Sequence, residues 1–302
     1  MLDIIIRAGS FIAIIALGFL LRRIGFFKAQ DFDVLAKICI RITLPCAIIT
    51  SFSGKTIDPA LLSLPLMALA CGGIYMTMGY LMNRGKGREK QAFAMLNLAG
   101  YNIGTFVIPF AQSFLGPMGV VAVSIFDTGN AVVCLGGGYS VASTVKDGKG
   151  FSVKRIAKSL GTSAPFIAYM TMLVMNLLHL GVPGFVLSVA EVGASANAFM
   201  AMLMIGVGFH LEANKEQLAA IGKILAVRFS LAAVFACAFY FLTPFALEIR
   251  QALVILAFAP IGSAVPAFTR EMESDVGLSS AINSIAMVIS IAIIVTLLVF
   301  MV

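Results

Sequence analysis

A short polar pattern, FDTGN, lies inside an otherwise apolar stretch of this chain. It places Asp127 near the centre of that stretch and Asn130 one helical turn further on. In a membrane, an acid at such a position costs roughly 2.5 kcal/mol or more unless it is protonated or paired, which marks it as a candidate functional residue. We therefore expect Asp127 to carry a coupling proton or to help bind a cation. A neutral Asp127 that only bonds neighbouring helices is the structural alternative.

Two further segments interrupt apolar stretches with glycine and proline. These are NIGTFVIP (Asn102–Pro109) and PIGSAVP (Pro260–Pro266). Gly104 and Gly262, and likewise Pro109 and Pro266, stand at nearly the same offset along the chain. The pair Asp127-Thr128 matches Asn283-Ser284 at almost that offset. Because proline removes a backbone hydrogen bond, and broken helices within a membrane are tolerated where they line a cavity, the pattern predicts two broken helices that cross.

At each break the outgoing half-helix presents free N–H groups and about half a positive charge. Two such ends directed at one cavity would bind an anion, most commonly a carboxylate. Gly104 and Gly262 would allow close backbone approach, while Asn102, Thr105 and Ser263 would cap the broken ends. Ordinary proline kinks are the alternative. The residues predicted to bind the ligand are Asn102, Gly104, Thr105, Pro109, Asn130, Gly262, Ser263 and Pro266.

Other intramembrane charges carry weaker signals. Glu191 lies near Ser195 and Asn197 on one helical face, where it could join a cation path or equally reach towards the outer surface. Arg41 and Arg228 are predicted to extend to the cytoplasmic interface, as long basic side chains do. No metal-ligand spacing and no phosphate-binding or hydrolase motif occurs, so we expect neither a cofactor nor an enzyme.

The elements that position these residues are membrane-spanning helices. The chain has 302 residues, of which 60% are hydrophobic and 12% charged, and its mean hydropathy is +1.02. A typical soluble domain is about 25% charged. With spans of roughly 20 residues, the sequence predicts a multi-pass, all-α membrane protein. The ten predicted spans are residues 2–21, 34–53, 59–82, 91–115, 118–142, 160–180, 184–209, 220–242, 249–269 and 278–301.

The basic residues predict the orientation. Loops after the odd-numbered spans hold fifteen Lys and Arg residues, whereas the opposite side holds only Arg7, Lys55 and Arg250. The positive-inside rule then places both termini outside. The basic loop 146–158 divides the chain into residues 1–145 and 159–302, with five spans each. An odd number of spans per half inverts the second half, so we expect two inverted five-helix repeats with crossed, broken spans 4 and 9.

These features resemble the auxin efflux carrier family, which includes plant PIN carriers and bacterial permeases associated with malonate or malate. The residues that carry the resemblance are LPCAIITSF (Leu44–Phe52), the Asn-x-Gly-(x)4-Pro of residues 102–109, FDTGN and the ten-span layout. The resemblance implies the fold of bile-acid/sodium symporters and sodium/proton antiporters. It also implies a scaffold of spans 1, 2, 6 and 7, a moving domain of spans 3–5 and 8–10, and a homodimer. The substrate carboxylate would lie beside Asn102.

The chain departs from that family in two respects. It lacks the long central loop of the plant carriers, and it has no acid between Gln251 and Thr269 to act as the sodium ligand of the bile-acid relatives. We expect a secondary transporter of a small organic anion, such as a dicarboxylate or an auxin-like acid. It would work by elevator-type alternating access in the inner (plasma) membrane, with H⁺ or Na⁺ as a possible coupling ion and no nucleic-acid partner.

Two alternatives remain open. A cation/proton antiporter or sodium-coupled symporter on the same fold would bind its ion at Asp127 and Glu191. A non-transporting membrane receptor would require large extramembrane domains, for which ten spans leave no room in this chain.

Overall fold

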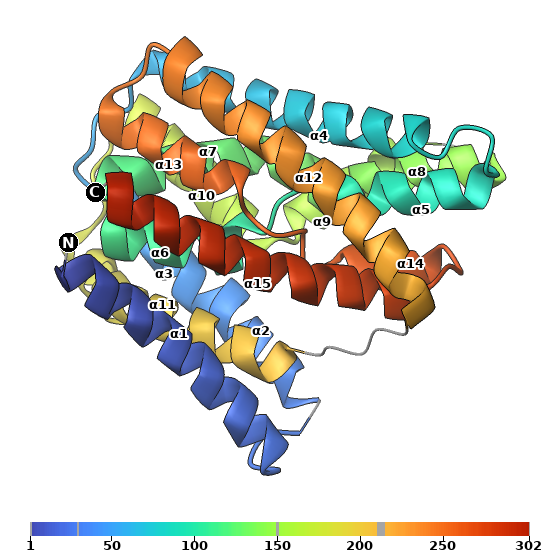
Figure 1. Cartoon of the computed structure of the whole chain (residues 1–302). Coiled ribbons are helices and arrows are strands. Elements are labelled where there is room, and N and C mark those ends of the chain that lie inside the picture. Colours follow the sequence, from blue (N-terminus) through green and yellow to red (C-terminus); the bar gives the residue numbers. More distant parts are fainter. Residues whose placement is uncertain (1, 29, 149–150, 210–214, 302) are drawn as a thin grey trace.

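The structure is a computed structural model that describes residues 2–28, 30–148, 151–209 and 215–301, and every regular element within them is helical (Figure 1). The first part contains α1 (Leu2–Arg23), α2 (Asp31–Ile38), η1 (Cys39–Thr43), α3 (Leu44–Phe52), η2 (Pro59–Ser63), α4 (Leu64–Leu81), α5 (Arg88–Leu98), η3 (Ile103–Val107), α6 (Ile108–Phe114), α7 (Pro117–Val132), η4 (Val133–Gly137) and α8 (Gly138–Asp147). The second part contains α9 (Val153–Gly161), α10 (Ala164–Leu177), α11 (Gly184–Gly208), α12 (Lys215–Leu242), α13 (Leu247–Ala257), α14 (Val265–Glu271) and α15 (Val276–Met301).

Several of these helices, alone or joined end to end, form stretches that are long and apolar enough to cross a membrane. The described residues hold seven such stretches, or eight if α9 and α10, which meet at a bend of 77°, form one span. They coincide with eight of the ten predicted spans. The other two predictions, residues 34–53 and 249–269, fall on the shorter consecutive helices α2–η1–α3 and α13–α14. The helical, multi-pass class is therefore confirmed, while the count of ten, the inverted repeat and the orientation stay predictions.

Two helices are interrupted, but not at the prolines. After α5 the chain turns through Gly100, whose φ of +75° is left-handed, and helical structure resumes at η3. The second interruption lies between α13 and α14. Pro109 and Pro266 occupy the first turn of α6 and of α14. The backbone is therefore unwound at or just before the predicted segments, a few residues ahead of each proline, and Pro266 in the first turn of α14 loses no hydrogen bond that this helix would have made.

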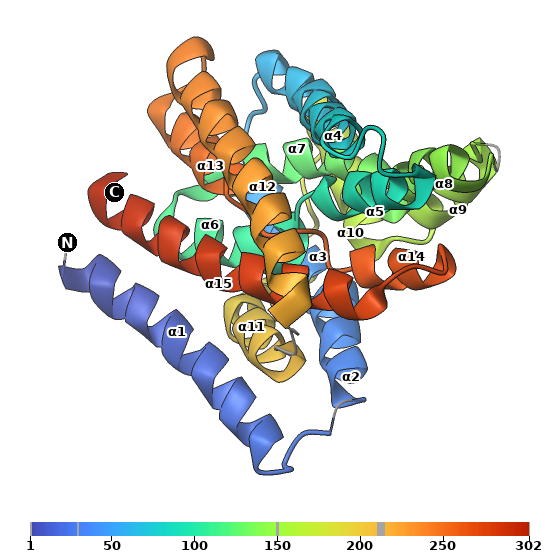
Figure 2. The same cartoon turned by 45° about the vertical axis from the view of Figure 1, so that its right-hand side comes forward.

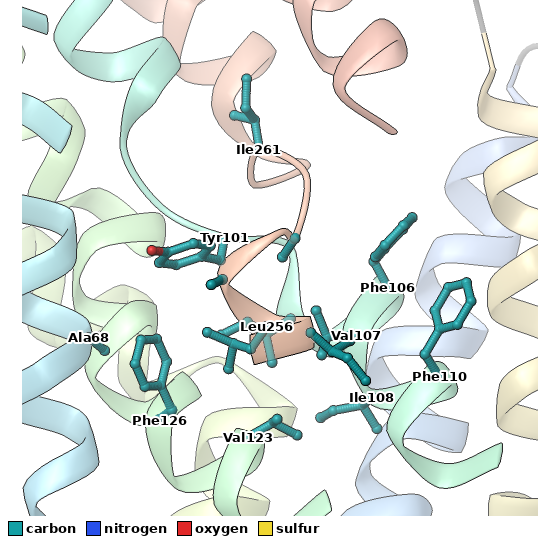
Figure 3. Close-up of a cluster of buried hydrophobic side chains, with 14 of the residues drawn as sticks. Ala68, Tyr101, Phe106, Val107, Ile108, Phe110, Val123, Phe126, Leu256 and Ile261 are labelled. Carbon is teal, nitrogen blue, oxygen red and sulfur yellow. The ribbon is translucent and has the colours of Figure 1, made fainter. Parts of the chain in front are cut away.

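The core surrounds the first interruption. Figure 3 shows Tyr101 and Ile261 on the two unwound segments, with Leu256 of α13 near them and Phe106 and Phe126 in the same cluster. All five side chains are at most 2% exposed. Apolar residues on the outer faces are instead open, such as Phe185 of α11 at 82% exposure. A membrane-facing surface has this distribution, because lipid tails solvate apolar side chains.

The long helices α1 and α11 pack closely against each other. A Cβ added at Gly18 would lie 2.5 Å from the carbonyl oxygen of Leu203, and one at Gly206 would meet the backbone of α1. Small residues at such contacts let helix backbones pack directly in lipid. Both chain termini lie at one end of the molecule (Figures 1 and 2). Within the predicted linker 146–158, α8 ends at Asp147 and α9 begins at Val153, while residues 149–150 lie outside the described part, and the division into two halves stays a prediction.

Candidate functional site

A cavity of about 130 Å³ lies where the unwound segments approach α7 and α10. It brings together most of the residues that the sequence predicted for ligand and ion binding. Those lining it are Asn102, Gly104, Thr105, Asp127, Asn130, Gly262 and Ser263. Pro109, Pro266 and Glu191 are not among its lining residues.

The two unwound segments contact each other directly beside this cavity. The backbone N–H of Asn102 donates to the carbonyl oxygen of Pro260 across 2.9 Å. The predicted glycines leave little room. A Cβ at Gly104 would lie 2.8 Å from Leu44 Cδ2, and one at Gly262 would lie 3.1 Å from Cys134 Sγ. Each glycine therefore allows a neighbouring side chain to approach its backbone, while the predicted approach of a ligand to these glycines stays a prediction.

Three π-helical turns contribute to the cavity wall. They are η1, η3 and η4, which supply Ile40, Ile103 and Cys134 among other residues. Single π turns within α-helices are frequently found at functional sites. Two of them end two residues before a proline, Pro45 or Pro109, whose ring is incompatible with the carbonyl position of a regular α-helix. The prolines thus shape the cavity indirectly, through the turn before them.

Asn130 fixes the backbone of the first interruption. Its Oδ1 accepts a hydrogen bond from the N–H of Tyr101, and its Nδ2 donates to the carbonyl of the same residue, both across 2.9 Å. The second proton of Nδ2 is donated to Asp127 Oδ1 at 2.7 Å. Both the oxygen and the nitrogen of this amide bond to protein groups, so in this structure Asn130 holds the backbone of Tyr101. Its predicted role in binding the substrate directly stays a prediction.

Asp127 is buried and fully hydrogen-bonded. Its Oδ2 accepts from the hydroxyl of Tyr169 on α10 at 2.9 Å, and its Oδ1 accepts from Asn130. No described basic side chain forms an ion pair with it. A buried carboxylate without a cationic partner is expensive when ionised. Asp127 is therefore the cavity residue on which a proton has the largest effect.

The predicted caps are not formed. Asn102 and Ala264 precede η3 and α14 without side-chain hydrogen bonds to the helix N–H groups. Asn102 Oδ1 instead accepts from the hydroxyl of Thr105 at 2.7 Å, and Ser263 is exposed at the cavity. The prediction that Asn102, Thr105 and Ser263 cap the breaks is therefore wrong. The first N–H groups of η3 keep no intrahelical acceptor, and the Nδ2 of Asn102 has no acceptor among the described residues.

One arginine donates hydrogen bonds to the backbone carbonyls at the ends of both interrupted helices. The sequence pattern predicts a different position for this residue. Arg228 of α12 is 1% exposed. Its guanidinium donates to the carbonyls of Leu98 at 2.6 Å and Gly100 at 3.0 Å, and to those of Ala259 at 2.8 Å and Pro260 at 3.1 Å. The prediction that Arg228 extends to the interface is therefore wrong. It binds the negative ends of α5 and α13 together.

Aromatic rings complete the surroundings of this cation. The guanidinium carbon lies 5.1 Å from the ring centre of Tyr75 and 5.3 Å from that of Tyr101, within the range of cation–π attraction. The four carbonyls and two rings replace the carboxylate that a buried arginine usually requires. A signal was available in the sequence. Two broken helices leave unpaired terminal carbonyls, and Arg228 is a donor well inside a span. Arg41, by contrast, is exposed, as expected.

Glu191 lies outside the cavity. It is exposed on α11 and does not line the cavity, whereas Asn197 of the same helix is buried and bonded to Thr43 and Gln112. The structure therefore does not bring Asp127 and Glu191 together. A two-acid cation site is not formed by these residues.

Comparisons with known proteins bear on the class to which this chain belongs. The model of a family described as "Membrane transport protein" matches residues 10–153, which include the first interrupted helix, Asp127 and Asn130. The resemblance to a transporter family is confirmed. An "Uncharacterized transporter" of Methanothermobacter thermautotrophicus is 25% identical over 208 residues, which cover 67% of this chain and 66% of that protein, just under two thirds of its length. The chain is thus a multi-pass membrane protein that resembles the auxin efflux carrier family.

Proposed function

We propose that this protein is a secondary transporter of a small organic anion that carries a carboxylate. The observation that carries the proposal is the direct contact between two unwound segments, Asn102 to Pro260, at the edge of a cavity that polar side chains such as Asp127 and Asn130 help to line. Irregular backbone at membrane depth is tolerated where it lines a cavity, and in transporters it forms the substrate site. The family resemblance supports the same conclusion.

The charge distribution favours an anion over a cation. Arg228 already neutralises the carbonyl ends of α5 and α13, so those negative ends are not available to a cationic ligand. The outgoing helix η3 begins at the cavity with uncapped N–H groups, where an anion is stabilised. The amide of Asn102 and the hydroxyl of Ser263 add donors beside it.

Asp127 supplies a physical reason for proton coupling. An anion bound in a cavity of about 130 Å³ lies close to this carboxylate, and two negative charges in one water-poor site repel strongly. A proton on Asp127 removes that repulsion. By linkage, anion binding and proton binding then favour each other, so we propose that anion and proton are carried together. Proton coupling of this kind requires only one acidic residue, Asp127, and Glu191 lies outside the cavity.

For the transport cycle we propose an elevator movement in ten spans arranged as two inverted repeats. The scaffold of spans 1, 2, 6 and 7 would include α1, α10 and α11, and the moving part would carry both unwound segments. The same resemblance suggests a homodimer, and the inner (plasma) membrane is the proposed location. The runner-up, a cation/proton antiporter on this fold, would rely on Asp127 alone in the cavity.

The proposal is tested by purified protein in detergent and in proteoliposomes. We expect mono- and dicarboxylates to raise the melting temperature and to be taken up, and Asn102→Ala to weaken their binding about tenfold, since a hydrogen bond to a charged group contributes about 1.5–3 kcal/mol. Asn176→Ala, near the C-terminal end of α10 and not among the residues that line the cavity, is the matched control. Equal carboxylate affinity in Asn102→Ala and the parent protein would contradict the site.

A further inference from the structure

A second, larger pocket of about 550 Å³ lies at the end of the molecule opposite the chain termini. It is formed where the turn between α4 and α5, the start of α12 and the turn between α14 and α15 meet (Figures 1 and 2). None of its lining residues also lines the cavity where the two unwound segments approach α7 and α10. By the positive-inside rule this end is expected to face the cytoplasm.

Three lysines line this pocket without acidic partners. No described carboxylate lies within 4.0 Å of the ammonium groups of Lys86, Lys90 or Lys223. Lys223 donates only to the carbonyl of Met82, at 3.0 Å, and it lies close enough to Lys86 for the two cations to interact. Unpaired cations that share one concave site repel each other, and a bound anion would relieve that repulsion.

The two acids that line the pocket, Glu89 and Asp275, offset only part of the positive charge of the three lysines. Both carboxylate oxygens of Asp275 accept hydrogen bonds, Oδ1 from the N–H of Leu278 in α15 at 2.8 Å and Oδ2 from the side-chain amide of Gln217 in α12 at 3.3 Å. Glu89 stands in the first turn of α5. The lining therefore keeps an excess of one positive charge. The start of α5 faces the pocket as well, and its helix dipole adds to the attraction for an anion.

The deeper wall of the pocket is apolar. Phe93, Ala94 and Ile224 are buried, and Leu278 is half-buried. A ligand that combines an anionic head with an apolar body matches a basic rim over an apolar wall. Basic pockets between membrane helices on the cytoplasmic side bind anionic lipid headgroups through such an arrangement.

We propose that this pocket binds the phosphate of an anionic phospholipid, with Lys86, Lys90 and Lys223 as its cationic contacts. The site is distinct from the proposed transport site. Its three lysines come from the α4–α5 turn and from α12, so a bound headgroup would bridge these elements.

The experiment compares lipid retention by native mass spectrometry in the full-length protein. The probes are phosphatidylglycerol, phosphatidylcholine and inorganic phosphate. Replacement of Lys86, Lys90 and Lys223 by glutamine should weaken phosphatidylglycerol binding about fivefold for each lysine removed, because each basic residue near a lipid surface contributes about 1 kcal/mol. Phosphatidylcholine binding should be unchanged. The matched control replaces three exposed lysines outside the pocket, Lys28, Lys154 and Lys158, and should retain phosphatidylglycerol like the parent.

Three outcomes would overturn the proposal. Equal retention of both lipids would remove the headgroup specificity. An equal loss in the control variant would show that net charge, and not this pocket, attracts the lipid. Inorganic phosphate that displaces phosphatidylglycerol at millimolar concentration would reassign the pocket to a free phosphate compound. A normal melting temperature of the triple variant would establish that it is folded.

Discussion

The hydroxyl of Tyr169 donates a hydrogen bond to Asp127 Oδ2 across 2.9 Å and so joins α10 to α7. On its other oxygen, Asp127 accepts from Asn130, which in turn holds the backbone of Tyr101. A chain of hydrogen bonds therefore connects a helix of the proposed scaffold to the first unwound segment. In the proposed cycle α10 stays fixed while α7 moves, so this contact must break in each turnover.

We expect Tyr169→Phe to shift the protein away from the described arrangement. The substitution removes one hydroxyl and keeps the ring, and a hydrogen bond to a charged group contributes about 1.5–3 kcal/mol, or about tenfold or more in an equilibrium. The readout is the rate at which a water-soluble maleimide labels Cys134, which lines the cavity and is half-buried. With Cys46 and Cys237 replaced by serine, this rate should fall several-fold.

The matched control is Tyr240→Phe. The hydroxyl of Tyr240 has no partner among the described residues, so its removal should leave the labelling of Cys134 unchanged. Equal labelling rates in Tyr169→Phe and the parent would mean that this bond does not influence the conformational equilibrium.

The positions of the two breaks were predictable because their signals are local. Glycine and proline act on their own stretch of backbone, so Gly104 and Gly262 located the two segments to within a few residues. The residue at which the first break occurs could not be predicted. Gly100, whose φ is +75°, is one of many glycines in the chain and nothing in the sequence distinguishes it. Asp127 was found because an acid within an apolar span is rare.

The role of Arg228 could not be read from its own neighbourhood. Its four acceptors come from segments that lie about 30 and about 130 positions away in the sequence, and only the fold brings them together. Tyr169 was missed for the same reason, because a tyrosine within an apolar helix does not reveal which carboxylate it will reach. Asn130 was assigned to the ligand, whereas both ends of its side chain hold protein groups.

Two replacements of Arg228 should distinguish how much its positive charge and how much its hydrogen-bond geometry contribute to stability. Arg228→Met leaves four carbonyls without their donor, and loss of one partner in a buried charged network costs about 3–5 kcal/mol. We expect a large fall in melting temperature, whereas Arg228→Lys keeps the charge but not the fork of donors and should fall by less. Arg41→Met, at an exposed position, should melt close to the parent. A similar small change in all three variants would contradict the bridging role.

Gly100→Ala tests the backbone of the first unwound segment. Its φ of +75° is unfavourable for alanine by about 1–2 kcal/mol, and the added Cβ would overlap Cys134 Sγ. We expect lower thermal stability and weaker carboxylate binding, measured by a thermal-shift titration. Combining it with Cys134→Ala should restore only part of the stability, since the overlap is relieved and the φ strain remains. Gly9→Ala, where a Cβ meets nothing within 4 Å, should be neutral.

Asp127→Asn tests the proposed coupling. In the parent protein we expect an acid that stays ionised throughout the titration to bind more tightly as the pH falls, by up to about tenfold per pH unit, because protonation of Asp127 removes the repulsion between the two negative charges. Asparagine is neutral at every pH, so the variant should bind with a flat pH profile and should lose proton uptake in proteoliposomes. Glu191→Gln, which alters an exposed acid outside the cavity, should keep the parental profile. If Glu191→Gln flattened the profile and Asp127→Asn did not, the proton site would lie on α11 and the cation antiporter hypothesis would gain the advantage.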